Sequence, residues 1–182
     1  MTLQDSSPGG NAPRHYGKYK GLVVNNFDED ELGRIQVMVP DVFGAFPSPN
    51  WAMPCVPAAG FHAGFFIVPP IGSKVWVEFE QGDPQHPIWT GGFWGKKEAP
   101  VLATSPPAIP LGQNIVLQTT GTSVIALCDS APSENTGGIV LKSGGATIVI
   151  NETGIYIDNG AGAKITLVGG SVAINDDGLT VT

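Results

Sequence analysis

Hydrophobic and polar residues alternate in short runs along most of the chain, and the runs end at Gly, Asn, Asp or Pro. The clearest example is the stretch from residue 165 to 182, where apolar pairs two positions apart recur between turns. Alternation with a period of two is typical of β-strands that have one apolar face. No window repeats apolar residues at helical spacing between good helix formers, so the pattern predicts an all-β protein.

The first half of the chain predicts a small barrel over residues 15–98. Strands are expected at 19–28, 32–40 and 51–60, the last as an edge or rim strand because prolines interrupt it, and three more within 65–94. All four Trp and all eight Phe lie in this part, so a conventional core can form there. A closed or nearly closed barrel of the five-stranded oligonucleotide/oligosaccharide-binding (OB) type fits this pattern.

Composition then changes abruptly. Residues 1–14 are rich in Ser, Pro, Gly and Asn, and we interpret them as a flexible N-terminal arm. Residues 99–111 form a Pro-rich linker, expected to be semi-extended. From residue 112 to 182 the chain contains no Phe or Trp, which places a domain boundary within the linker.

The second half consists of short strands with one apolar pair each. The pairs expected to face inward are Ile115/Leu117, Val124/Ala126, Ile139/Leu141, Ile148/Ile150, Ile155/Ile157, Ile165/Leu167, Val172/Ile174 and Leu179/Val181. Each step between pairs has room for only one strand and a turn, whereas a single-chain β-helix takes roughly 20 or more residues per coil. Two apolar residues per strand do not make a core alone.

Three copies around a threefold axis resolve this difficulty. Each strand would close one side of a triangular prism, its apolar pair would point to a shared axis, and the strand edges of one chain would pair with the next chain. Residues 112–182 are therefore predicted to form an intertwined trimeric triangular β-helix, or β-prism, that folds only on assembly.

The net charge and the N-terminal sequence limit which partners and which cellular location we expect. The net charge of −7 argues against nucleic acid as a partner, because nucleic-acid binders need a basic surface. The N-terminus has neither the charged start nor the apolar run of a signal peptide, and no stretch approaches the roughly 20 apolar residues of a membrane span. We expect synthesis in the cytoplasm without a signal peptide.

The candidate chemical sites favour structural roles. The acidic run 28–31 is interpreted as a solvated turn, because it lacks the ligand spacing of a calcium loop. Gly82, Asp83 and Pro84 are interpreted as a structural turn of the barrel, with Asp83 capping backbone amides. His15, His62 and His86 are scattered, and no nucleophile or carboxylate pair has a catalytic setting. We therefore predict no catalytic residues, no metal, no cofactor and no enzyme activity.

The stretch GFFIVPPIGSKVWVEFEQGDPQHPIWTGGFW, with LGRIQVMVP and WAMPCVPAAG upstream, resembles the barrel of the central spike proteins of contractile injection systems. That family includes phage baseplate assembly protein V, the gp-five-like spikes and the VgrG proteins of type VI secretion. Residues 69–91 match nearly every position of its pattern, and the resemblance extends over about 15–182. The chain is similar to a short form, without a lysozyme-like insert, an effector domain or a terminal His-x-His.

The resemblance implies a homotrimeric spike that is seated on a baseplate hub protein and punctures the target envelope when a sheath contracts, contacting the membrane transiently. It also implies a blunt tip, formed by Leu179, Val181 and Thr182, that carries a PAAR-type protein. The particle would be a phage virion, a phage-tail-like particle or a secretion apparatus. The alternative is a trimeric adhesion module, either tail-fibre-like or glycan-binding through aromatics such as Trp51 or Trp94.

Overall fold

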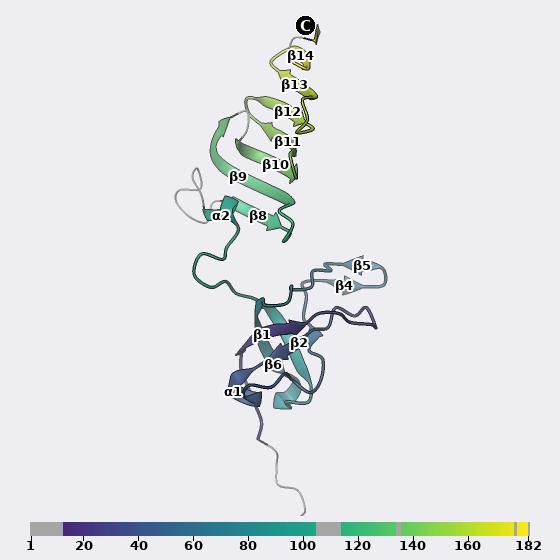
Figure 1. Ribbon diagram of the computed structural model, residues 1–182, viewed down its shortest axis with the longest axis vertical. Helices are drawn as coiled ribbons and strands as arrows, with labels where there is room; N and C mark the ends of the chain where they lie inside the picture. The colour runs from purple at the N-terminus through teal and green to yellow at the C-terminus, as the bar shows by residue number, and fades with distance from the viewer. Residues whose placement is uncertain (1–12, 105–113, 134–135, 177, 182) are drawn as a thin grey trace, which may run out of the picture. The chain divides into compact units, whose positions relative to one another are not determined.

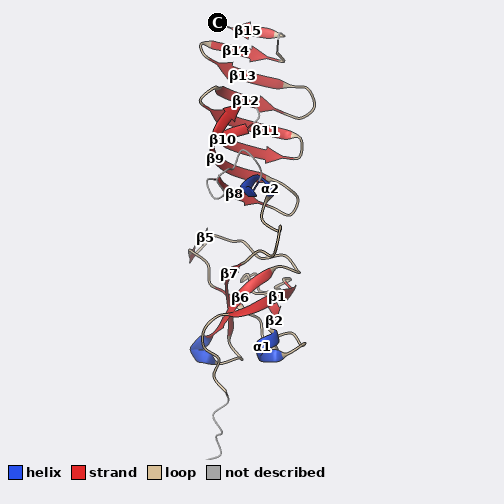
Figure 2. Ribbon diagram, turned by 90° about the vertical axis from the view of Figure 1, so that its left-hand side faces the viewer, coloured by secondary structure: helices blue, strands red, loops and turns tan. Residues whose placement is uncertain are grey.

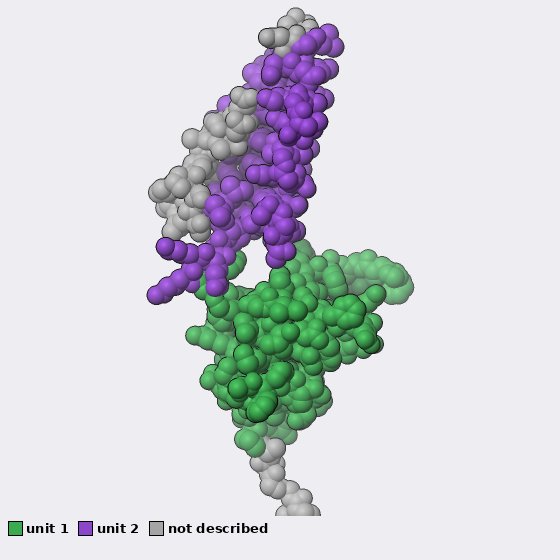
Figure 3. Space-filling model, in the orientation of Figure 1, with its two compact units in different colours: residues 1–95 green, residues 96–182 purple. Residues whose placement is uncertain are grey.

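The computed structural model describes residues 13–104, 114–133, 136–176 and 178–181. The chain divides into two compact units, unit 1 at residues 1–95 and unit 2 at residues 96–182 (Figure 3). β-Strands are the main regular secondary structure of both units, which confirms the predicted all-β class (Figure 2).

Unit 1 contains a five-stranded sheet in the order β2-β1-β6-β7-β3. Neighbouring strands are antiparallel except β3 and β7, which are parallel. The sheet closes on itself where Ile35 and Ala52, just before β2 and β3, exchange two backbone hydrogen bonds of 3.1 and 2.8 Å. Closure removes the open edges of a small barrel. The strands are β1 (Tyr19–Asn25), β2 (Gln36–Met38), β3 (Met53–Pro54), β6 (Lys74–Phe79) and β7 (Pro87–Gly92).

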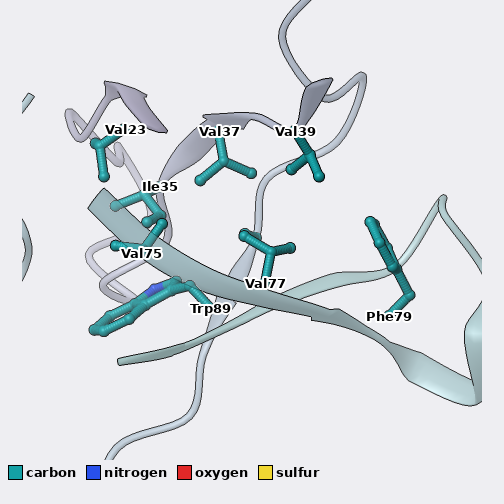
Figure 4. Packing of buried hydrophobic residues seen from close by; sticks show 9 residues of the cluster. Val23, Ile35, Val37, Val39, Val75, Val77, Phe79 and Trp89 are labelled. Atoms are coloured by element: carbon teal, nitrogen blue, oxygen red, sulfur yellow. The ribbon is translucent and has the colours of Figure 1, made fainter. Parts of the chain in front are cut away.

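Alternate residues of these strands fill the barrel (Figure 4). In β6, Val75, Val77 and Phe79 point inward while the residues between them are partly exposed. The indole N–H of Trp89 donates to the carbonyl of Gly33 at 3.1 Å, so the polar group of this buried ring has a partner. The buried apolar residues are Val23, Ile35, Val37, Val39, Ala52, Val75, Val77, Phe79 and Trp89.

Residues 65–94 contribute two strands rather than the expected three. Residues 65–73 form no strand, because Pro69 and Pro70 have no N–H to donate to a ladder. The end of this segment is instead attached to β1, since Gly72 N–H donates to Val23 O and Val23 N–H to Ser73 O. Unit 1 also contains a separate hairpin of β4 (Ala59–Gly60) and β5 (Ala63–Gly64), the helix α1 (Pro40–Phe43) and the 3-10 turn η1 (Glu80–Gly82).

The predicted N-terminal arm and the predicted linker differ in part from expectation. Residues 1–12 of the predicted arm lie outside the described residues, but Arg14 lies 3.6 Å from Asp83 and donates to Gln81 O at 3.5 Å. In the predicted linker, residues 105–111 are also outside the described part, and Val101–Thr104 form the short helix α2 rather than an extended segment. Pro100 precedes this helix, and proline is tolerated at the start of a helix. None of the helices that the structure describes is long and apolar enough to cross a bilayer.

Unit 2 is an eight-stranded antiparallel sheet in which every strand pairs with its neighbours in sequence (Figure 1). The six strands from β9 to β14 are therefore paired on both edges within one chain, and the expectation that their edges pair with another chain is wrong. Turns this short lead each strand straight back along the previous one. The strands are β8 (Asn114–Gln118), β9 (Val124–Ser133), β10 (Thr136–Ser143), β11 (Ala146–Asn151), β12 (Gly154–Asp158), β13 (Lys164–Val168), β14 (Ser171–Ile174) and β15 (Leu179–Val181).

The acidic turn after β1 is organised around Asp28 rather than simply solvated. The Asp28 carboxylate, only 5% exposed, accepts hydrogen bonds from Arg34 Nε and Nη2 at 3.0 and 2.5 Å. It also accepts from the backbone N–H groups of Asp30, Leu32 and Arg34. The Arg34 guanidinium also pairs with Asp30 and lies 5.8 Å from the Trp51 ring centroid. The Arg34 side chain, followed by the backbone donors, holds the pKa of Asp28 well below its usual range.

Asp28→Asn tests this arrangement. The pKa of Asp28 is lower in the folded than in the unfolded protein, so its charge stabilises unit 1 above pH ~4, and this stabilisation is lost as the pH falls further. We expect a lower Tm for the variant at pH 7 and convergence with the wild type in acid. Tryptophan fluorescence measures this, because every Trp lies in unit 1. Glu29→Gln, an exposed carboxylate in the same turn, is the control, and a difference that does not depend on pH would contradict the assignment.

Gly138 in β10 tests the packing of unit 2. Its φ is +75°, and an added Cβ would collide with the Ile150 carbonyl oxygen. Gly144 has a similar φ of +59°, but an added Cβ there would meet no atom within 4 Å. We expect Gly138→Ala to destabilise unit 2 by about 2–4 kcal/mol, from left-handed strain and overpacking together. Gly144→Ala should cost only the strain, about 1–2 kcal/mol.

Thermal unfolding followed by far-ultraviolet circular dichroism at equal protein concentration compares the two glycine variants. Equal losses of stability would mean that the close approach of the Gly138 and Ile150 backbones is absent in solution.

Candidate functional site: an apolar face of the C-terminal sheet

One face of the unit 2 sheet carries a continuous row of aliphatic side chains, here called the apolar stripe. It arises from register: Ile148 lies opposite Ile157, and Ile150 lies opposite Ile155. Residues directly opposite each other in an antiparallel pair point to the same face, and the same matching recurs from β8 to β15. The stripe comprises Ile115, Leu117, Ile125, Leu127, Ile139, Leu141, Ile148, Ile150, Ile155, Ile157, Ile165, Leu167, Val172, Ile174 and Leu179.

The stripe is exposed in a single chain. Twelve of its members are more than one-third exposed, from 37% at Val172 to 65% at Ile115. Isolated exposed Leu or Ile residues are ordinary, but monomeric soluble proteins rarely expose a contiguous apolar surface that crosses a whole sheet. The stripe is therefore a surface that requires a partner.

The opposite face of the same sheet holds a small buried cluster. Val124, Ala126, Val140 and Val149 are buried there, with Val116, Cys128 and Tyr156 packed against them. The prediction that Val124 and Ala126 belong to the inward pairs is therefore wrong, because register puts Ile125 and Leu127 on the stripe instead. Four consecutive apolar residues at 124–127 do not alternate in polarity, so the sequence pattern could not choose between the two faces.

The turns on one side of the sheet are tied to neighbouring strands by short polar contacts. The Asn175 side-chain oxygen accepts from Lys164 N–H at 2.9 Å, and Asn175 N–H donates to Lys164 O at 3.0 Å. Asn159 accepts from the N–H groups of Ala161 and Ala163 at 2.8 and 3.0 Å. An added Cβ on Gly160 would lie only 2.5 Å from the Gly145 carbonyl carbon, so the turns touch. These contacts limit bending of one strand against the next.

The predicted tip residues fall on the last strand or beyond it. Leu179 begins β15 and is 54% exposed on the stripe, opposite Ile174. Val181 lies opposite Val172 in the register of β14 and β15, and Thr182 lies outside the described residues. In the described part of the chain, β15 is paired along one edge only, with β14.

The predicted barrel turn lies between β6 and β7. Gly82 is buried with a φ of +76°, and an added Cβ would lie 2.9 Å from the Tyr16 ring. The Asp83 carboxylate accepts a hydrogen bond from Gln85 N–H at 3.0 Å, and Pro84 lies between them. Only glycine fits both the backbone conformation and the contact at position 82.

Two family models match the chain, and each coincides with one of these structural features. Residues 19–94 match the type VI secretion system/phage-baseplate injector OB domain, which covers the barrel. Residues 114–180 match the phage baseplate V C-terminal trimerisation domain, which covers the sheet with the apolar stripe. Together the two matches span more than three quarters of the chain. The chain is thus a baseplate spike-like protein, in which an injector OB domain is followed by a phage baseplate V C-terminal trimerisation domain.

Proposed function

We propose that this chain is the structural central spike of a contractile tail or injection machine. In this proposal three copies assemble into one rigid body, which is seated on the baseplate hub and punctures the target envelope when the sheath contracts. The observation that carries the proposal is the apolar stripe, because it lies in the trimerisation domain and is exposed in a single chain.

Three stripes that face a common axis cover one another. Fully burying an Ile or Leu side chain contributes about 1.5–3 kcal/mol, and the stripe residues are about half buried already. Covering the remainder therefore contributes on the order of 10 kcal/mol per chain. Three such sheets that enclose one axis would form a triangular prism, in which each chain supplies one side.

Such a prism suits a part that transmits force. Every described member of the stripe is Ile, Leu or Val, so the enclosed axis is dry and densely packed. Hydrogen bonds between successive strands and the contacts between turns extend along the length of the sheet. The work of the molecule is mechanical in this proposal, and no residue is assigned to catalysis.

The distal end is proposed to carry a PAAR-type tip protein. Within the described part of the chain, the edge of β15 away from β14 has no paired strand and offers backbone donors and acceptors, and Leu179 offers an apolar contact. A partner that covers this edge would remove the hazard of edge-to-edge aggregation. Leu179, Val181 and Thr182 remain the proposed contact residues.

A glycan-binding or fibre-like adhesion role is the second candidate, and one depression in unit 1 favours it. The depression is lined by aromatic and polar side chains: Asn25, Phe27, Glu29, Asp30, Arg34 and Trp51. Aromatic rings beside hydrogen-bonding groups suit a sugar, although Arg34 already lies over the Trp51 ring. Binding of the full chain to a glycan array, lost in Trp51→Ala, would support this role, whereas no binding is expected of a purely mechanical spike.

Ile157→Asp tests the trimer axis. Three carboxylates would be brought onto an apolar axis, where each unpaired buried charge costs several kcal/mol. We expect loss of the trimer by native mass spectrometry. Thr166→Asp is the matched control, because it adds the same charge one strand away, opposite Tyr156 on the other face. A trimer that survives Ile157→Asp as well as Thr166→Asp would contradict the proposed axis.

A further inference from the structure

Unit 1 carries a second surface that its own fold leaves uncovered. The hairpin of β4 and β5 with its flanking residues, 57–67, is here called the arm, and it projects from the five-stranded barrel sheet (Figure 1). Every residue of the arm is exposed in the single chain. Phe61 at its turn is 93% exposed, and Phe65, Phe66 and Ile67 are 58%, 72% and 63% exposed.

The arm has no core of its own. Its ladder pairs Ala59 with Gly64 and Gly60 with Ala63, and Phe65 N–H donates to Ala58 O at 2.9 Å. An isolated two-stranded hairpin is marginally stable at best, and side chains this small add little packing. Small residues in a strand also mark places where another backbone or side chain approaches closely. A partner that packs against the arm would therefore stabilise it.

The partner must accept an uncharged surface. Residues 42–73 contain no Asp, Glu, Lys or Arg, although the chain as a whole carries a net charge of −7. Copies of an acidic chain repel one another through most of their surfaces. The segment that includes the arm is free of this repulsion, so it is the part of unit 1 best suited to contact another copy.

Trimerisation brings that partner close. Residues 96–113 separate unit 1 from the first strand of unit 2 and span at most about 60 Å when fully extended. Three copies of unit 1 attached to one trimeric unit 2 therefore have effective concentrations in the ~mM range toward one another. An apolar contact with a Kd of about 1 mM or lower is therefore largely formed in the trimer.

We propose that the arm packs against a neighbouring copy of this chain, so that unit 1 joins the trimer contact made by unit 2. The contact runs head-to-tail around the threefold axis and closes after three copies. This inference rests on the trimer of the proposed function. The barrel thereby takes part in holding the three chains together.

Site-specific photo-crosslinking in the full chain tests the arm contact. Phe61 is replaced by p-benzoyl-phenylalanine, which under near-ultraviolet light inserts into C–H bonds that it touches. Phe66 provides a second arm position, and Phe27 provides the control, because it is 76% exposed in unit 1 but lies beside the acidic turn. We expect covalent dimers and trimers from both arm positions on denaturing gels, and several-fold less from Phe27.

The possible outcomes test the trimer and the arm contact separately. Native mass spectrometry before irradiation establishes whether the chain is trimeric, and a monomer would contradict both the spike and the arm contact. A trimer whose arm positions yield only single-chain products, or no more adduct than Phe27, would overturn the arm contact alone. Adducts that form only with an added foreign protein would likewise exclude a second copy as the occupant.

Discussion

The trimerisation domain depends on one constraint: a single sheet cannot cover its own apolar face. The strands of unit 2 form a single sheet, and β9 to β14 already have both edges paired within the chain. Backbone pairing therefore builds the sheet, whereas burial of the stripe requires other chains. The stability of unit 2 therefore depends directly on whether the chain is assembled.

The two units bury their apolar side chains in different ways. Unit 1 closes a five-stranded sheet and fills it with its own Val, Ile, Phe and Trp side chains, so it has a complete core. Unit 2 has a small buried cluster on one face and an uncovered stripe on the other. A self-sufficient barrel joined in one chain to an assembly-dependent sheet agrees with the proposed spike, in which the barrel would contact the hub and the trimeric sheets would form the rigid body.

Alternation and composition were enough to predict the all-β class, the barrel and the positions that form most of the stripe. They failed where several apolar residues follow one another, as at Val124–Leu127, since only the register with β8 and β10 decides which face each residue takes. They also missed the enclosed Asp28, because its burial depends on Arg34 six positions away and on three backbone donors. The arm escaped notice for a similar reason: an exposed Phe and a buried Phe look alike in a sequence.

The central claim is that three chains share one interior, and the mass of the native particle over a dilution series measures this most directly. We expect a species of three times 18.9 kDa that loses the β-structure of unit 2, but not that of the barrel, as it dissociates. A stable 18.9 kDa monomer that keeps the unit 2 sheet folded would contradict it.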